Sequence, residues 1–159
     1  MIKIKVIAQG KLKEKYLKEA SGEYHKRLSR YCDIDIIEQQ PVTLPESPSA
    51  PQIESALLRE AENIGRQLGP NTFNIALCVE GKALSSEELA ELFKRKSAQG
   101  TPINFIIGSS YGLHSSVKSK ADLKLSVSAM TFPHQLFRVM LLEQVYRAFK
   151  INEGGTYHK

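Results

Sequence analysis

Two short stretches decide the fold: Phe73-Asn-Ile-Ala-Leu-Cys-Val79 and Ile103-Asn-Phe-Ile-Ile107. Each is almost continuously apolar over the length of a β-strand, without the alternation expected of a strand that has one face in water. Strands of this kind are buried on both faces, which is typical of parallel sheets covered by helices on two sides. The two stretches therefore predict the centre of a mostly parallel sheet.

Further strands and amphipathic helices alternate outward from these two stretches. Strands are predicted at 2–8, 32–37 and 123–127, and helices at 14–30, 52–68, 85–100, shortly after 112 and 133–150. The proline-rich segment 39–51 predicts an exposed loop, because closely spaced prolines interrupt helices and strand ladders. The alternation predicts an α/β fold with a mostly parallel sheet. The 159 residues predict a single domain spanning 1–159.

Composition narrows the class of protein. Apolar residues make up 42% and charged residues 25% of the chain, an ordinary globular balance. No apolar stretch has the length of a membrane span, and the opening Met1-Ile-Lys-Ile-Lys lacks the apolar core of a signal peptide. We therefore expect a cytoplasmic location and no membrane partner. Cys32 and Cys78 are interpreted as reduced core thiols, and with no clustered Cys or His we expect no metal site.

Charge is unevenly distributed along the chain. Residues 1–31 carry a net charge of +6, residues 32–91 a net charge of −8, and residues 92–159 a net charge of +7. A single block of like charge would be explained by ordinary helix faces in contact with solvent. Two basic blocks around an acidic middle also fit a basic face that binds a phosphate-rich partner.

Three predicted strand ends carry loops of unusual composition, and ligands of open α/β sheets bind at the carboxyl ends of strands. The loops are Leu77-Cys-Val-Glu-Gly-Lys82, Ile107-Gly-Ser-Ser-Tyr-Gly-Leu113 and Ser126-Val-Ser-Ala-Met-Thr-Phe-Pro-His134. Neither a GxGxxG fingerprint nor a Walker A loop is present, which argues against a nicotinamide enzyme and an NTPase. Gly108 and Gly112 serve either a tight turn, which spacing alone favours, or a backbone wall beside a flat ligand.

The helix predicted at 133–150 has apolar residues on nearly every face. A helix of this kind must be buried all round, and a second copy of the chain could bury it, so we predict a homodimer. Arg138 and Arg147 are then either partly buried ion-pair members or site residues, and Glu143 lies at pairing distance from Arg147. His134, at the helix start, is expected to be neutral, and pattern alone favours a packing or capping role.

Four stretches together resemble one known family. They are Gly10-Lys-Leu-Lys13, Ile106-Ile-Gly-x-x-x-Gly-Leu113, Leu125-Ser-x-Ser-x-Met-Thr-Phe-Pro-His134 and Arg138 through Tyr146-Arg-Ala148, and Tyr157-His158-Lys159 fits as well. In these residues the chain resembles the ribosomal large-subunit pseudouridine N3-methyltransferase family (RlmH), over essentially its whole length.

The resemblance implies a fold, a cofactor and partners. It implies a SPOUT-type α/β domain with a C-terminal trefoil knot, S-adenosyl-L-methionine as methyl donor, and a homodimer formed around the knot. The substrate would be a pseudouridine of large-subunit (23S) rRNA within the assembled ribosome. Carried over by position, the cofactor residues are Leu77, Gly108, Val127, Ser128, Ala129, Met130, Thr131 and Phe132. Family members usually have a second glycine where this chain has Ser109, and its side chain would narrow the pocket rim.

Methyl transfer to N3, which the resemblance implies, needs a group that removes the N3 proton or stabilises the resulting anion, because N3 of neutral pseudouridine is protonated. Candidate catalytic or substrate-binding residues are His134, Arg138, Tyr157 and His158. Arg138 could stabilise an anionic base or bind phosphate, and the family places the tail near the partner subunit's active site. No single base is identified. A non-catalytic RNA-binding or ribosome-assembly factor is the alternative, and the intact loop 127–134 favours the enzyme.

Overall fold

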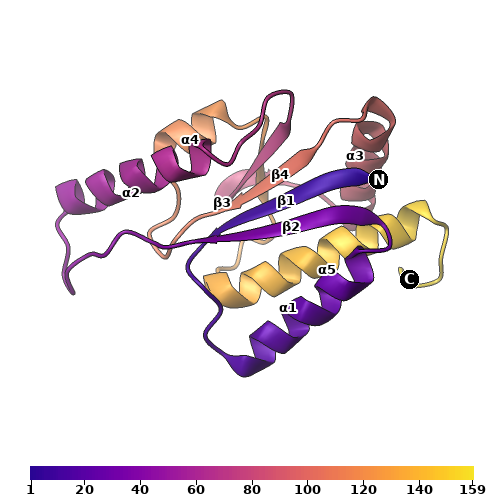
Figure 1. Ribbon diagram of the computed structural model, residues 1–159, viewed down its shortest axis with the longest axis horizontal. Coiled ribbons are helices and arrows are strands. Elements are labelled where there is room, and N and C mark those ends of the chain that lie inside the picture. Colours follow the sequence, from indigo (N-terminus) through magenta and orange to yellow (C-terminus); the bar gives the residue numbers. More distant parts are fainter.

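A five-stranded parallel sheet forms the middle of the computed structural model, which describes residues 1–159 (Figure 1). In chain order the elements are β1 (Ile2–Gln9), α1 (Lys15–Leu28), β2 (Cys32–Gln39), α2 (Ala50–Gly65), β3 (Phe73–Ala83), α3 (Ser86–Gln99), β4 (Ile103–Ile107), α4 (Ser115–Lys120), β5 (Leu123–Ser126) and α5 (His134–Asn152). The predicted α/β alternation is confirmed.

The strands lie in the order β2-β1-β4-β3-β5, and every neighbouring pair is parallel. All five residues of β4 are buried, as its continuous apolar sequence predicts. Helices α1, α3 and α5 cover one face of the sheet, and α2 and α4 cover the other (Figure 1). Successive side chains of β1 point to opposite faces of the sheet, so that Ile4 and Val6 belong to the larger core and Ile7 belongs to the smaller one.

The start of α2 differs from the prediction. The segment from Gln40 to Pro48 has no helix or strand, as its prolines predict. However, α2 begins at Ala50, and Pro51 lies in its first turn rather than in the loop. Ser49 and Gln52 form a capping box, in which each side chain binds the backbone N–H of the other residue. Proline fits a first turn because that position needs no N–H donor.

Strand β3 is interrupted where a simple turn was predicted. Leu77 and Lys82 both pair with Leu125 of β5, so Cys78–Gly81 form a bulge and the strand then resumes to Ala83. The prediction that β3 ends at Val79 was therefore wrong. A Cβ on Gly81 would lie 2.7 Å from the Leu125 backbone. Only glycine lets the strand return this closely to β5.

Helix α5 buries one stripe of side chains within its own chain. The stripe is Arg138, Leu141, Leu142, Val145 and Ala148, against the sheet and the flanking helices α1 and α3. Leu136 on the same helix stays 37% exposed, so α5 is not buried on every side in one chain. No helix of the chain is long and apolar enough to cross a membrane.

Candidate functional site

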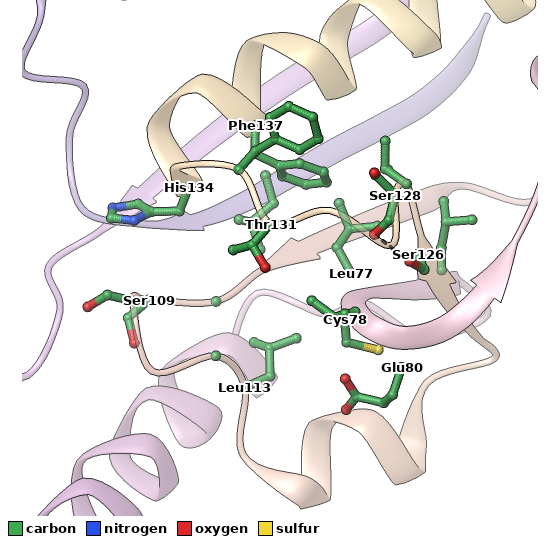
Figure 2. Close-up of a pocket in the computed structure, with 18 of the residues that line it drawn as sticks. Leu77, Cys78, Glu80, Ser109, Leu113, Ser126, Ser128, Thr131, His134 and Phe137 are labelled. Atoms are coloured by element: carbon green, nitrogen blue, oxygen red, sulfur yellow. Dashed lines mark hydrogen bonds between the residues drawn. The ribbon is translucent and has the colours of Figure 1, made fainter.

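The loops that follow β3, β4 and β5 surround one cavity of about 750 Å³ at the carboxyl edge of the sheet. Figure 2 shows side chains from all three loops around this space. Of the residues predicted to bind a cofactor, Leu77, Gly108, Val127, Ser128, Met130, Thr131 and Phe132 line it, and Ala129 does not. Half of the lining residues are hydrophobic, which is typical of small-molecule sites of this volume.

The loop 108–112 is both a tight turn and a cavity wall. The Gly112 N–H donates to the Ser109 carbonyl at 2.8 Å, and Gly112 has φ +86°. A Cβ on Gly108 would lie 2.4 Å from the Gly112 carbonyl oxygen. Glycine at position 108 is thus required by the loop's own backbone.

The loop after β5 is held by serine side chains. The Ser126 hydroxyl donates to the Ser128 carbonyl at 3.1 Å, and the Ser128 hydroxyl accepts from the Met130 N–H at 2.9 Å. These bonds fix the loop without a regular element, as serine commonly does in turns. Ser128 and Thr131 line the cavity together with Phe137 of α5 (Figure 2). Sequence analysis missed Phe137 because its helical spacing indicates only core packing.

The β3 bulge supplies the polar wall of the cavity. The Glu80 carboxylate and the Lys118 ammonium lie 2.5 Å apart, and this hydrogen bond is the main cause that lowers the pKa of Glu80. Cys78 lines the cavity, so its assignment to the core was wrong. Burial, aided by Glu80, raises the pKa of the Cys78 thiol. Cys32 is a buried core thiol, as predicted, and burial raises its pKa to about 12.

His134 lines the cavity at the start of α5 (Figure 2). Burial lowers its pKa below the usual 6.5, and the positive charges of Arg138 and Lys13 lower it further. The imidazole is therefore neutral at neutral pH, as sequence analysis expected from its place in the helix. A neutral imidazole has one nitrogen free to accept a proton.

Arg138 does not line this cavity. Its guanidinium is buried and donates to the Glu38 carboxylate at 2.5 Å and to the Gly10 carbonyl at 2.9 Å. It borders a separate groove between α1 and the ends of β1 and β2. Of the two roles left open for Arg138, the structure shows the ion-pair member.

Tyr157 and His158 lie near the other end of α5. Tyr157 donates to Glu143 at 2.7 Å, and His158 contacts Arg147 at 3.2 Å and Glu87 at 2.7 Å. The predicted Glu143–Arg147 pair is present at 2.7 Å. His134 and Arg147 are separated by about 20 Å along the helix, at a rise of about 1.5 Å per residue. The chain's own tail is therefore remote from its own cavity.

The fold and the cavity define an α/β protein with a small-molecule site, lined by apolar and polar residues alike, at the ends of three parallel strands. No group of three or more His, Cys, Asp and Glu side chains is gathered to hold a metal ion.

Burial, with help from the Glu143 carboxylate, raises the pKa of Tyr157 to about 12, so the phenol keeps its proton at neutral pH. Among these residues, His134 is the one that lines the cavity, with a neutral imidazole that has one nitrogen able to accept a proton.

Comparisons with known proteins identify the family. Residues 2–158 match the family model described as a predicted SPOUT methyltransferase. The chain is 46% identical over 159 residues to proteins named "Ribosomal RNA large subunit methyltransferase H" from Streptococcus equi subsp. zooepidemicus and Streptococcus uberis, covering 99% of this chain and 100% of each relative. A probable methylase family protein from Haemophilus influenzae Rd KW20 has a similar fold (TM-score 0.54, 15% identity), covering 100% of this chain and 72% of that one.

The chain therefore belongs to the SPOUT methyltransferase family, in the group that includes the ribosomal RNA large subunit methyltransferase H proteins.

Proposed function

We propose that this protein transfers a methyl group from S-adenosyl-L-methionine to N3 of a pseudouridine in large-subunit rRNA, on the assembled ribosome in the cytoplasm. The observation that carries the proposal is the cavity at the ends of β3, β4 and β5, which the three loops singled out in the sequence surround. Family membership supports methyl transfer, and the names of the full-length relatives support the rRNA substrate.

The residues around the cavity fit the methyl donor. Apolar side chains such as Leu77 and Phe132 can hold the adenine ring, and the backbone of the serine-fixed loop 126–130 offers N–H and C=O groups to its edge. Glu80 can accept from a ribose hydroxyl, although Lys118 already binds its carboxylate. When bound, the donor supplies an electrophilic methyl carbon on its sulfonium.

The chain must hold N3 in line with that carbon and remove the N3 proton. We assign proton removal to His134, whose neutral imidazole lines the cavity. Tyr157 is a hydrogen-bond donor in this scheme, because burial and the hydrogen bond to Glu143 raise its pKa to about 12. In this scheme Arg138 acts through Glu38 and Gly10, to which its guanidinium donates.

The proposal includes a homodimer and a C-terminal trefoil knot. The tail lies about 20 Å along α5 from its own cavity, so Tyr157 and His158 can reach a substrate only in the cavity of a second chain. The exposed side chains around the start of α5 favour such a pairing, because Met130 is 75% and Leu136 is 37% exposed.

Calorimetry and a methyl-transfer assay test the proposal together. The purified protein should bind S-adenosylmethionine and its demethylated product, and should bind neither NAD nor ATP. It should then transfer a labelled methyl group to ribosomes isolated from cells that lack the gene. Donor binding without transfer to ribosomes would contradict the rRNA substrate, and failure to bind the donor would contradict the whole proposal.

A further inference from the structure

A second groove, of about 380 Å³, lies between α1 and the carboxyl ends of β1 and β2. Lys11, Lys18, His25 and the buried Arg138 line it, and Glu38 is its only acidic residue. Figure 1 shows α1 and α5 side by side on one face of the sheet. The side chains of Lys11, Lys18 and Arg138 bring three positive charges to one carboxylate, so the groove suits an anion.

The lysines of this region have no acidic partners. Lys11, Lys13 and Lys18 form no ion pair, whereas Lys15, Lys118 and Lys150 each pair with a glutamate. The Nε of Arg138 is also buried without an acceptor. Unneutralised cations around a groove repel one another, and a bound anion relieves that repulsion.

Hydrogen bonds from two elements, β2 and α5, hold the basic loop 10–13 in place. Gly10 donates to the Gln39 carbonyl at 2.6 Å and accepts from Arg138. The Leu12 N–H donates to Glu38 at 3.2 Å, and the Lys13 N–H donates to the Gln135 side chain at 2.9 Å. Leu12 is buried, so Lys11 and Lys13 on either side of it are turned to solvent.

The same loop adjoins the methyl-transfer cavity. Gln135, which accepts from Lys13, follows His134 directly in α5. The Lys13 charge is also close enough to affect the His134 imidazole. The loop 10–13 therefore lies between the groove and the residue that we assign to the N3 proton.

We propose that this groove, with the loop 10–13, binds a backbone phosphate of the rRNA strand beside the target nucleotide. The inference rests on the proposed function. Lys11 and Lys18 contact the phosphate, Lys13 lies toward the cavity, and Arg138 is a positioning residue that holds the loop through Glu38 and Gly10. Phosphate contacts of this kind fix the position of an RNA strand without reading its sequence.

The test compares two double variants with equal charge loss. Lys11→Gln with Lys18→Gln removes two groove charges, and Lys3→Gln with Lys26→Gln removes two exposed charges that do not line the groove. We expect the groove variant to raise the KM for ribosomes about tenfold. Each lost phosphate contact should also reduce the salt dependence of binding by about one in log–log slope. The affinity for S-adenosylhomocysteine should stay unchanged in both.

Co-sedimentation with ribosomes separates the possible failures. If the wild type binds ribosomes with a groove-dependent salt slope but transfers no methyl group, the proposed function fails and the groove assignment stands. If the wild type methylates ribosomes and the groove variant matches the control variant in KM and salt slope, the groove assignment fails. Equal ribosome binding by all three proteins also overturns it.

Arg138→Lys tests the positioning role, because lysine keeps the charge but cannot make the two directed bonds. We expect a higher KM for ribosomes with unchanged kcat and unchanged donor affinity. A lower kcat with unchanged KM would mean that Arg138 acts in the chemical step instead. Wild-type kinetics would show that the loop needs no such support.

Discussion

Gly108 controls the shape of the cavity wall through its own loop. Because a Cβ there would lie 2.4 Å from the Gly112 carbonyl oxygen, we expect Gly108→Ala to displace the loop 108–112 and weaken S-adenosylhomocysteine binding at least tenfold. Gly65→Ala is the matched control, since nothing lies within 4 Å of a Cβ at position 65. That change at the end of α2 should leave binding unchanged. Calorimetry measures both, and equal affinity for the two variants would contradict this role of Gly108.

His134 should titrate below its usual pKa of 6.5 in an NMR pH series. A folded-state pKa below the unfolded value means that the unfolded chain binds more protons, so acid below about pH 6.5 destabilises the fold. Lys13→Gln removes one of the charges that lower this pKa and should raise it. Lys15→Gln is the control, because Lys15 is not among the causes of the shift. A His134 pKa of 6.5 or above in the wild type would refute the neutral imidazole.

The two thiols should differ in reactivity. Cys78 lines the cavity and should react slowly with a maleimide, since its pKa is raised, whereas the buried Cys32 should not react in the folded protein. Bound S-adenosylhomocysteine should protect Cys78. Mass spectrometry of the labelled peptides measures both, and unprotected labelling of Cys78 at saturating ligand would place the ligand elsewhere.

At the scale of elements, different residues of α5 allow folding and association to be tested separately. Leu142 is fully buried in the core, so Leu142→Asp should unfold the chain and is unsuited to testing a dimer. Leu136 is 37% exposed at the start of the same helix. We expect Leu136→Asp to keep a wild-type circular dichroism spectrum while sedimentation shows monomers. A wild-type monomer at micromolar concentration would refute the dimer.

The order of elements could be predicted from the sequence because hydrophobic periodicity reports burial directly. The continuous apolar residues of β4 predict a strand that is buried on both faces, and the structure has it there. The β3 bulge could not be predicted, because it depends on the close approach of Gly81 to Leu125, residues far apart in the chain. The capping box has a local sequence pattern, Ser49 followed three residues later by Gln52, but the surrounding prolines favour a loop there.

The candidate site could be predicted in part. Loops at strand ends and the family resemblance indicate the cavity, and of the eight residues predicted to bind the cofactor all but Ala129 line it. The resemblance does not show which neighbouring elements each residue of α5 meets. Arg138 and His134 lie one turn apart, yet one borders the groove and the other the cavity. Their separation depends on the tertiary partners Glu38 and Gly10, which no local pattern shows.

At the scale of the whole molecule, the tail and the cavity should work together only across two chains. Deleting Tyr157–Lys159 should leave donor binding intact and abolish methylation of ribosomes. Mixing this truncated chain with Gly108→Ala chains should restore activity at one of the two sites of a mixed dimer, if the tail acts in trans. Activity of the truncated protein alone at the wild-type rate would show that the tail has no such role.

The most direct measurement is mass mapping of the modified nucleotides in large-subunit rRNA from cells that lack the gene. We predict the loss of a single methyl group, carried on N3 of a pseudouridine. The wild-type gene should restore that methyl group, and a gene for the chain without Tyr157–Lys159 should not. Ribosomal RNA with unchanged modifications in the deletion strain would contradict the account.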